Sequence, residues 1–288
     1  KFSLISKAAK NRFLLSKLFK AAGVSRSGYY KWKARKLTSI TADENLVIKL
    51  FNEKKGKYGV RRLQMLIYRR YKRTINIKKI KRIKRDFGLI TEVRKKNKMR
   101  LIFKAGEEHK VAPNILKRDF IPITKRTYFS TDVTELPYLG GRKAYLSAMK
   151  DLATNEIVHF NILQRPTGDL VTTNLEQVFE KYSSLIRSRM IVHSDQGVHY
   201  TSEAFRAKLE KLGITQSMSR KGNCLDNSPI ESFFGHLKDE VSFRSCKTFA
   251  EVKKKIENYI DYYNNERPQW GLERKTPAEA GVELSLVF

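Results

Sequence analysis

The sequence predicts an α/β protein, in which a mixed five-stranded sheet flanked by helices follows small all-helical units. Three observations lead to this prediction. Residues 13–90 show apolar side chains at helical spacing, three β-type runs begin at residue 128, and beyond them short apolar strands alternate with helical segments. The charge changes at the same place, because residues 1–127 hold 38 Lys and Arg against eight Asp and Glu, whereas residues 128–288 hold 21 of each.

The net charge of +30 therefore lies entirely in the first part of the chain. A basic part joined to a neutral part favours a segment that holds a polyanion, attached to a domain that acts on it. Binding to ribosomes or to an anionic membrane surface is the alternative for any basic chain. The ordered helical pattern with interspersed aromatic residues favours nucleic acid.

Composition excludes several other classes of protein. A hydrophobic content of 41% is enough for real cores, and no apolar stretch approaches the roughly 20 residues that span a bilayer. The N-terminus lacks the order of a signal peptide, so we expect a soluble intracellular protein with no membrane partner. The two cysteines belong to no Cys-x-x-Cys pair, which argues against a zinc finger or a disulfide framework. The chain begins with Lys1 and not with Met, which is consistent with a fragment of a longer product.

Residues 1–40 are expected to form a DNA-binding segment of the helix-turn-helix type. Apolar residues at helical spacing precede a Gly23-Val24-Ser25 turn, and a second helix is expected to begin near Ser27. A helical hairpin without DNA contact is the alternative. The residues predicted to contact DNA at the front of the second helix are Arg26, Ser27 and Tyr30.

Residues 41–90 are expected to form a small three-helix domain with a basic exterior. Apolar residues define one face of each helix, and the opposite faces are strongly basic. A solvated surface usually mixes charges, but Asp86 is the only acidic residue between Gly59 and Ile90, so phosphate contact is favoured. The predicted DNA-contacting residues are Arg61, Arg62, Lys79, Lys81, Arg82, Lys84 and Arg85.

Residues 91–127 lose this periodicity and carry a Gly106-Glu107-Glu108 turn, Pro113 and Pro122. We interpret them as an extended basic linker between domains, running along DNA. Residues 128–288 then form the sheet-containing domain with a helical extension at its C-terminal end. Strands are expected at 128–139, 143–152, 156–163, 190–193 and 214–218, with helices at 167–181 and 202–212 and others beginning near 228 and 248.

Three acidic residues occupy unusual positions in this domain. Asp132 interrupts the apolar pattern of the first strand, where a carboxylate is costly to bury without a partner. Asp195 follows a short apolar strand, with Gly197 giving the backbone room to turn. Glu231 lies near the start of a helix, for which Asn227 or Ser228 is the expected N-cap. The alternative is that each acid is a cap or a surface residue.

Clustered carboxylates suit phosphodiester chemistry. Two divalent cations roughly 4 Å apart can activate the attacking oxygen and stabilise the leaving oxygen of such a transfer. Cations of this kind need several hard oxygen ligands held together. Asp132, Asp195 and Glu231 could supply them, which would explain why Asp195 sits where a strand ends.

Several segments together resemble a known family. "STDVTEL", "HSDQGVHYTS", "SMSRKGNCLDNSPIESFFGHLKDE" and "YYNNERPQWGLERKTPAEA" are similar to the signatures of insertion-sequence-three family transposases, and more broadly of DDE transposases and retroviral integrases. Glu231 follows Asp195 with 35 residues between them, which matches the family spacing. The resemblance covers nearly the whole chain. Leu225 and Trp270 depart from the family pattern, at positions that bear on packing or end recognition.

This resemblance implies a ribonuclease-H-like core in which Asp132, Asp195 and Glu231 are catalytic and bind two Mg²⁺ ions, with Mn²⁺ as a substitute. Lys238 matches a basic residue that the family often carries, and we expect it to contact DNA. The family also has an upstream helix-turn-helix and leucine zipper from a first reading frame. No heptad run is found here, so the chain resembles the second-frame portion.

The implied activity is a metal-dependent DNA transposase that binds the terminal inverted repeats and both cuts and joins DNA. One element end would be joined to the other before integration, so at least a homodimer is expected on double-stranded DNA. Two alternatives remain: a metal-dependent nuclease that does not join, and a DNA-binding regulator. His193 and His199 could touch DNA or serve as structural hydrogen-bond partners, and Asp226 is expected to shape the loop before Glu231.

Overall fold

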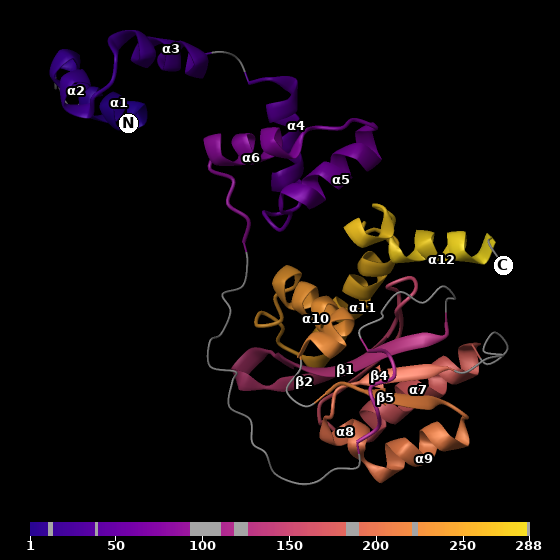
Figure 1. Ribbon diagram of the computed structural model, residues 1–288. Helices are drawn as coiled ribbons and strands as arrows, with labels where there is room; N and C mark the ends of the chain where they lie inside the picture. Colours follow the sequence, from indigo (N-terminus) through magenta and orange to yellow (C-terminus); the bar gives the residue numbers. More distant parts are fainter. Residues whose placement is uncertain are drawn as a thin grey trace.

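We describe the protein from a computed structural model, which covers residues 1–10, 14–37, 40–92, 111–117, 126–182, 190–220 and 224–286. Figure 1 shows a helical unit at the N-terminal end, a second helical unit, and a larger sheet-containing domain. Within the described ranges no helix is long and apolar enough to cross a membrane.

The first unit contains α1 (Phe2–Lys10), α2 (Leu15–Ala22) and α3 (Arg26–Leu37). Gly23 ends α2 in the left-handed conformation, with a φ of 58°, which glycine adopts at little cost. The expected helix, turn and second helix are therefore present as α2 and α3. Tyr29 is buried in a small core with Ile5 and Phe19, whereas Tyr30 remains exposed.

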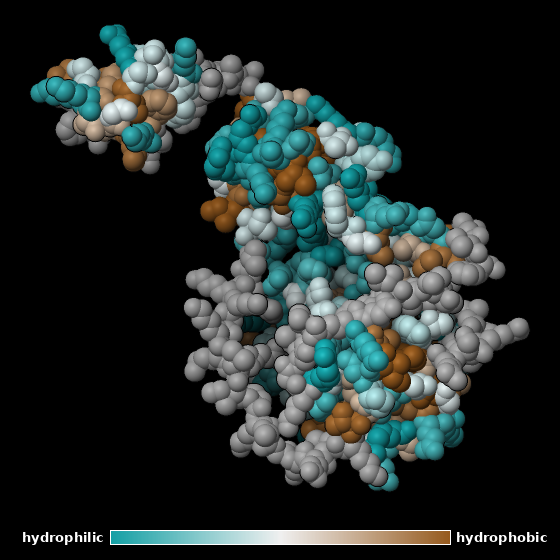
Figure 2. Space-filling view, in the orientation of Figure 1, coloured by the Kyte–Doolittle hydropathy of each residue, from teal (hydrophilic) through white to brown (hydrophobic). Residues whose placement is uncertain are grey.

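The second unit contains α4 (Ala42–Glu53), α5 (Val60–Tyr71) and α6 (Ile77–Asp86). Thr41 begins α4 with a capping box, in which its side chain accepts from the Glu44 amide and the Glu44 carboxylate accepts from the Thr41 amide. The apolar faces of the three helices meet in one buried core. Figure 2 shows that hydrophilic side chains cover most of the visible surface of this unit, as its basic sequence predicts.

The remaining domain is built on a five-stranded sheet in the order β3-β2-β1-β4-β5. Pairing between β1 and β2, and between β2 and β3, is antiparallel, whereas β4 is parallel to both β1 and β5. The sheet is therefore mixed, as the sequence predicts. Its strands are β1 (Tyr128–Pro137), β2 (Lys143–Asp151), β3 (Ile157–Leu163), β4 (Ile191–Ser194) and β5 (Thr215–Met218).

Helices cover both faces of this sheet (Figure 1). One buried core joins it to α10 (Ser228–Glu240) and α11 (Phe249–Asn265). A second core, on the opposite face, joins it to α7 (Asp169–Tyr182), α8 (Val198–Thr201) and α9 (Glu203–Lys211). The alternation along β1 decides which face each side chain meets, since Phe129 lies in the second core and Leu136 in the first.

The C-terminal part also contacts the second helical unit. There, η3 (Trp270–Leu272) and α12 (Pro277–Leu286) follow α11. Arg62 of α5 donates to Glu240 at the end of α10, with an N···O distance of 2.7 Å, and to the hydroxyl of Tyr262 at 3.0 Å. Arg69 pairs with Glu279 of α12 at 2.7 Å. The basic helical unit is thus held against the C-terminal helices of the sheet domain by ion pairs.

Part of the expected linker packs on the sheet. The amide of Ile115 donates to Ser217 Oγ at 3.0 Å, the amide of Met218 donates to the carbonyl of Pro113, and Leu116 is buried beside Ile191. Residues 111–117 therefore line the β5 side of the domain and do not run freely between domains. Residues 93–110 and 118–125 lie outside the described residues.

Candidate active site

Strand register brings Asp132 and Asp195 together. In the parallel pair β1 and β4, Tyr128 faces Ile191 and Ser130 faces His193, a constant offset of 63 positions. Continuing this register by two residues places Asp195, directly after β4, beside Asp132. Neighbouring strands lie about 4.8 Å apart, so the two carboxylates belong to adjacent positions in the middle of the sheet.

The turn after β4 explains why a carboxylate sits at this strand end. The amide of Gly197 donates to Asp195 Oδ1 at 2.9 Å, and a Cβ on Gly197 would stand 2.9 Å from that same oxygen. A side chain at position 197 would therefore displace the carboxylate. Gly197 has ordinary backbone angles, so it is required here for close approach and not for a left-handed turn.

Burial shapes the electrostatics of this pair. Desolvation raises the pKa of Asp195, opposed by the Gly197 amide and by the charge of His199. Tyr200 of α8 is fully buried and hydrogen-bonds to Thr131. Its pKa is raised well above the ordinary value, first by desolvation and then by the charge of Asp132, with a further contribution from Asp195. The charges of both carboxylates therefore act on the Tyr200 phenol. The sequence did not indicate this role, because a single tyrosine in a helix is usually interpreted as a core residue.

The start of α10 is fixed to β1 next to Asp132. Ser130 Oγ donates to Asn227 Oδ1 at 2.8 Å, and Asn227 Nδ2 donates to the carbonyl of Thr131 at 3.2 Å, all within the buried core. Asn227 does occupy the N-cap position, but its side chain makes no capping hydrogen bond. The expectation of a side-chain cap there is wrong, because the amide is used to bind the strand.

The other end of the α10 interface is fixed by Lys238, whose ammonium donates to Thr134 Oγ1. Ser130, Asp132 and Thr134 share one face of β1, since alternate residues of a strand do. Along α10, Asn227 meets the first of these residues and Lys238 the last. Glu231, one helical turn after Asn227 and seven residues before Lys238, occupies the stretch of α10 between those two contacts, where Asp132 lies on the strand.

The three acids thus come from three elements that meet at one region of the sheet. Glu231 is exposed and Asp132 and Asp195 are half-buried. Across the described ranges, no three Asp, Glu, His or Cys side chains converge closely enough to form a ready metal site. The aspartates are adjacent through strand register, and Glu231 stands on the neighbouring helix with its carboxylate toward the surface.

Two other polar residues near the acids are structural. His193 is buried, with its ring nitrogens 2.8 Å from Ser217 Oγ and 3.3 Å from Ser219 Oγ, and burial lowers its pKa. Asp226, also buried, accepts from the guanidinium of Arg220 and from the side-chain amide of Asn114. These contacts hold β5 and the loop before α10, in line with the loop-shaping role expected for Asp226.

The predicted DNA-contacting residues divide into two groups. Arg26, Ser27, Tyr30, Arg61, Lys81, Arg82 and Arg85 are exposed. By contrast, Arg62 is largely buried, bound to Glu240 and stacked 3.8 Å from the ring centroid of Tyr58. The structure therefore corrects the expectation for Arg62: its charge is used inside the protein.

Two lysines of α6 are also engaged within the helical unit. Lys79 pairs with Asp43 at 2.5 Å. Lys84 donates to Thr91 Oγ1 and lies 3.8 Å from the ring centroid of Phe51, where burial lowers its pKa. They offer less charge to a phosphate than the exposed cations of the same helix.

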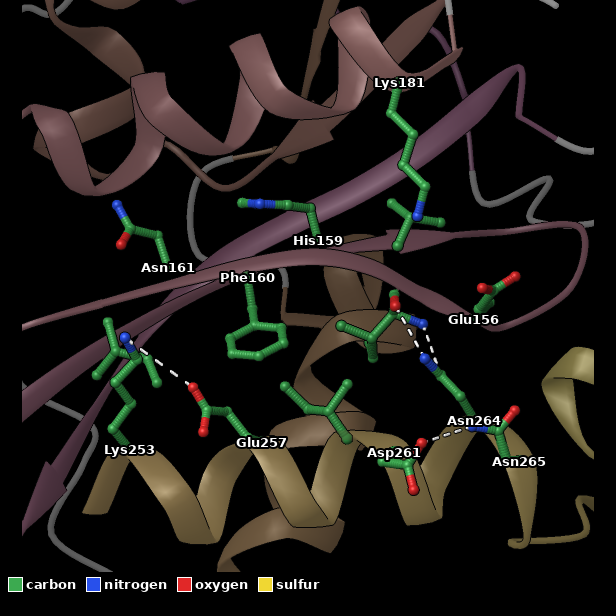
Figure 3. A pocket seen from close by; sticks show the side chains of 14 residues that line it. Glu156, His159, Phe160, Asn161, Lys181, Lys253, Glu257, Asp261, Asn264 and Asn265 are labelled. Carbon is green, nitrogen blue, oxygen red and sulfur yellow. Dashed lines mark hydrogen bonds and ion pairs between the residues drawn. The ribbon is translucent and has the colours of Figure 1, made fainter. Parts of the chain in front are cut away.

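A separate pocket lies between the edge strand β3 and α11. Figure 3 shows Phe160 pointing toward α11, with Glu257 and Lys253 on the helix facing it. The side chain of Asn264 exchanges two hydrogen bonds of 3.0 Å with the backbone of Ile157, so a side chain closes the strand edge at that point. β3 lies two strands away from β1 in the sheet, so this pocket is remote from the acids.

Comparison with known proteins identifies the family. Two models described as an integrase core domain match residues 125–224 and 212–277, and one described as an HTH-like domain matches residues 41–97. The transposase InsK named for insertion sequence element IS150 of Escherichia coli (strain K12) is 37% identical over 92% of both chains. The chain belongs to the insertion-sequence-three family of transposases.

Other relatives agree with this assignment. The transposase for insertion sequence element IS904 of Lactococcus lactis is 30% identical over 80% of this chain and 89% of its own length. The transposase InsF for insertion sequence IS3A of Escherichia coli (strain K12) is 28% identical over 90% and 91%. This protein is accordingly a DDE-type DNA transposase, with a ribonuclease-H-like integrase core and an HTH-like domain that implies DNA binding.

Solved structures with a similar arrangement were also found for this transposase. The catalytic core domain of BIV integrase aligns with a TM-score of 0.42 and 18% identity, over 56% of this chain and 97% of its own. The HTLV-2 integrase catalytic core domain in complex with magnesium aligns with a TM-score of 0.40 and 14% identity, over 55% and 97%.

Proposed function

We propose that Asp132, Asp195 and Glu231 form the catalytic centre of this transposase. The observation that carries the proposal is the register of β1 with β4, which sets Asp132 beside Asp195. The attachment of α10 to both sides of Asp132, through Asn227 and Lys238, supports Glu231 as the third member. Asp226, another acid of the same motif, is buried in contacts with Arg220 and Asn114, so we assign it a structural role.

The donor set fits a pair of divalent cations, Mg²⁺ in the first place with Mn²⁺ as a substitute. Paired carboxylate oxygens are the ligands that such ions prefer, and burial disfavours the charge of Asp195, so a bound cation would stabilise its ionised form. Asp132, Asp195 and Glu231 would hold the ions. When bound, the cations supply activation of the attacking oxygen and charge stabilisation at the leaving oxygen.

The protein's own groups would orient the reaction. Asn227 and Ser130 hold the α10 start against β1, which fixes the Glu231 backbone relative to Asp132. Gly197 holds the Asp195 carboxylate through its amide. Lys238, on the same face of α10 as Glu231, would turn its ammonium from Thr134 toward a DNA phosphate. The contacts of Asn227 and Gly197 are preorganised before substrate arrives, whereas Lys238 would change its partner.

DNA would be held by the exposed cations of the two helical units, with α6 contributing Lys81, Arg82 and Arg85. Recognition of terminal inverted repeats would place the protein on the nucleoid. Release of a 3′-OH at the element end, followed by its attack on a second phosphodiester, needs two ends in one complex. We therefore propose at least a homodimer as the active form.

The test is a strand-transfer assay on labelled DNA that carries the flanking repeats, with Mg²⁺, Mn²⁺ or EDTA. Asp195→Asn should abolish metal-dependent joined products. Asp169→Asn, at an exposed acid in the first turn of α7, is the matched control and should keep them. Cutting without joined products would instead show a nuclease, and repeat binding that Asp195→Asn leaves unchanged, with no cutting, would show a regulator.

A further inference from the structure

Two exposed aromatic rings and two arginines meet where α5 contacts the C-terminal segment. The guanidinium carbon of Arg61 lies 5.9 Å from the ring centroid of Trp270, and that of Arg274 lies 5.2 Å from the same centroid and 5.3 Å from that of Tyr68. Trp270 is 46% exposed and Tyr68 is 41% exposed. We call these four residues the aromatic platform; no step of the proposed mechanism uses its two rings or Arg274.

Arg61 differs from the other arginines of α5. Arg62 pairs with Glu240, Arg69 with Glu279 and Arg70 with Glu53. Among the described residues, Arg61 has an aromatic ring as its partner and no carboxylate. Its positive charge therefore remains available beside an exposed indole.

The loop that presents Trp270 and Arg274 is held in an unusual conformation. Glu273 and Arg274 have φ values of 52° and 71°, in the left-handed region that favours glycine. The loop is closed by hydrogen bonds of the Gln269 amide to the Lys275 carbonyl at 2.9 Å and of the Arg274 amide to the Gln269 carbonyl at 3.0 Å. A rigid and strained turn that projects an arginine over two aromatic rings is characteristic of a binding site.

The rings are not covered by the arginines. In the buried pair of Arg62 and Tyr58, the guanidinium carbon lies 3.8 Å from the ring centroid, which is stacking contact. Around Trp270 the corresponding distances exceed 5 Å. The guanidinium groups are therefore not in stacking contact with the indole, which is partly exposed and accessible to a further flat group.

Nucleic acid supplies flat groups of this kind next to negative charge. An unpaired base offers its π-face for stacking on an aromatic side chain, and the adjoining phosphates pair with arginine. A continuous duplex keeps its bases stacked on one another, so it could engage only the arginines. An exposed tryptophan between two guanidinium groups is thus suited to single-stranded DNA.

We propose that the aromatic platform binds an unpaired nucleotide of the DNA substrate, with its base on Trp270 and its phosphates between Arg61 and Arg274. This inference rests on the proposed function, in which DNA is cut at Asp132, Asp195 and Glu231. Glu231 and Glu240 are nine residues apart on α10, roughly 13 Å, and Glu240 binds Arg62, next to Arg61 in the chain. A strand a few nucleotides long reaches from the acids toward the platform.

The test uses the fact that the chain has two tryptophans, Trp32 and Trp270. In a Trp32→Phe, Asp195→Asn protein, Trp270 is the sole tryptophan, so its indole fluorescence can be excited selectively, and no DNA is cut. The probes are a repeat duplex with blunt ends, the same duplex with a single-stranded overhang, and a single-stranded oligonucleotide. We expect the overhang and the single strand to quench the indole at least about twofold, and the blunt duplex to quench it much less.

Affinity is measured alongside fluorescence. Trp270→Leu should weaken binding of the overhang about 10- to 100-fold, the range expected for one lost base stack. Trp270→Tyr should restore most of it. Tyr71→Leu is the matched control, because Tyr71 is on α5 and 45% exposed but has no arginine over its ring among the described residues. It should leave affinity unchanged.

Three results would overturn the proposal. Absence of quenching by every DNA would show that no base reaches the ring, and equal quenching by blunt and overhanging duplexes would show that the platform contacts only the backbone. Unchanged DNA affinity of Trp270→Leu with a changed oligomeric state would show a protein interface. Because this binding readout needs no catalysis, its failure is distinct from failure of the strand-transfer assay.

Discussion

Asn227 offers the sharpest test of how the candidate active site is assembled. Its side-chain amide accepts from Ser130 Oγ and donates to the carbonyl of Thr131, and all three residues are buried. Replacement by alanine would leave one hydroxyl and one carbonyl without these partners. Each orphaned buried group costs about 1–3 kcal/mol, so we expect Asn227→Ala to lower the free energy of unfolding by about 2–6 kcal/mol.

The same substitution should reduce activity more than stability explains. With the α10 start released from β1, a displacement of Glu231 by about 1 Å would lower the strand-transfer rate roughly 10²-fold. Urea unfolding followed by circular dichroism measures the stability, and single-turnover strand transfer at a temperature where the variant stays folded measures the rate. Asn161→Ala is the control, because Asn161 makes one longer hydrogen bond of 3.3 Å at an exposed site.

Asn227→Asp separates the two hydrogen bonds, since it keeps an acceptor for Ser130 and loses the donor to Thr131. We expect it to be intermediate in both measurements. A variant Asn227→Ala that is destabilised yet transfers strands at the wild-type rate would refute the positioning argument. An Asn227→Ala variant with the free energy of unfolding of the wild type would refute the assigned cost of the two orphaned groups.

Two further predictions concern buried charge. Burial lowers the pKa of Lys150 to about 7 in the folded protein, from the ordinary value of 10.5. Well below pH 7 the lysine is charged in both states, and the folded state bears the full cost of the buried charge. That cost disappears as the pH rises from 7 toward 10.5, the pKa in the unfolded chain. Relative to Lys150→Met, wild-type stability in urea should therefore increase from pH 7 to 10 by about 3–4 kcal/mol, and a flat difference would contradict the assignment. Arg62→Ala removes one of the two arginines on Glu240; we expect faster tryptic release of the α4–α6 unit, and an effect less than additive with Glu240→Gln.

Sequence patterns predicted the elements of the sheet domain closely. The five strands lie within two residues of their expected bounds, because alternation and turn residues are local signals. The four-residue helix α8 was not predicted because it is too brief to show a period, and α1 was also not predicted. Residues 111–117 were assigned to a linker because proline and charge suggested one, whereas hydrogen bonds to β5 fix them on the domain.

The candidate site was also predicted only in part from the sequence. Asp132, Asp195 and Glu231 stand out in the sequence as acids at a strand, a strand end and a helix start, and family motifs place them in order. The supporting roles of Tyr200 and of the Asn227 side chain, which binds β1, became visible only in the structure. From residue type alone, Tyr200 is expected to be a core residue and Asn227 a helix cap. Their additional roles follow only from the residues that they contact in the folded protein.

The sequence by itself determined the basic character of the first part, the α/β class of the second, the identity of the three acids and the family. Tertiary structure decided that β1 and β4 pair with an offset that sets Asp132 beside Asp195, and that Arg62 turns inward to Glu240 while Arg61 turns to Trp270. The physical reason is that periodicity and charge are properties of neighbouring residues. Strand register and ion-pair choice depend on packing between segments that lie about 60 to 210 residues apart in the chain.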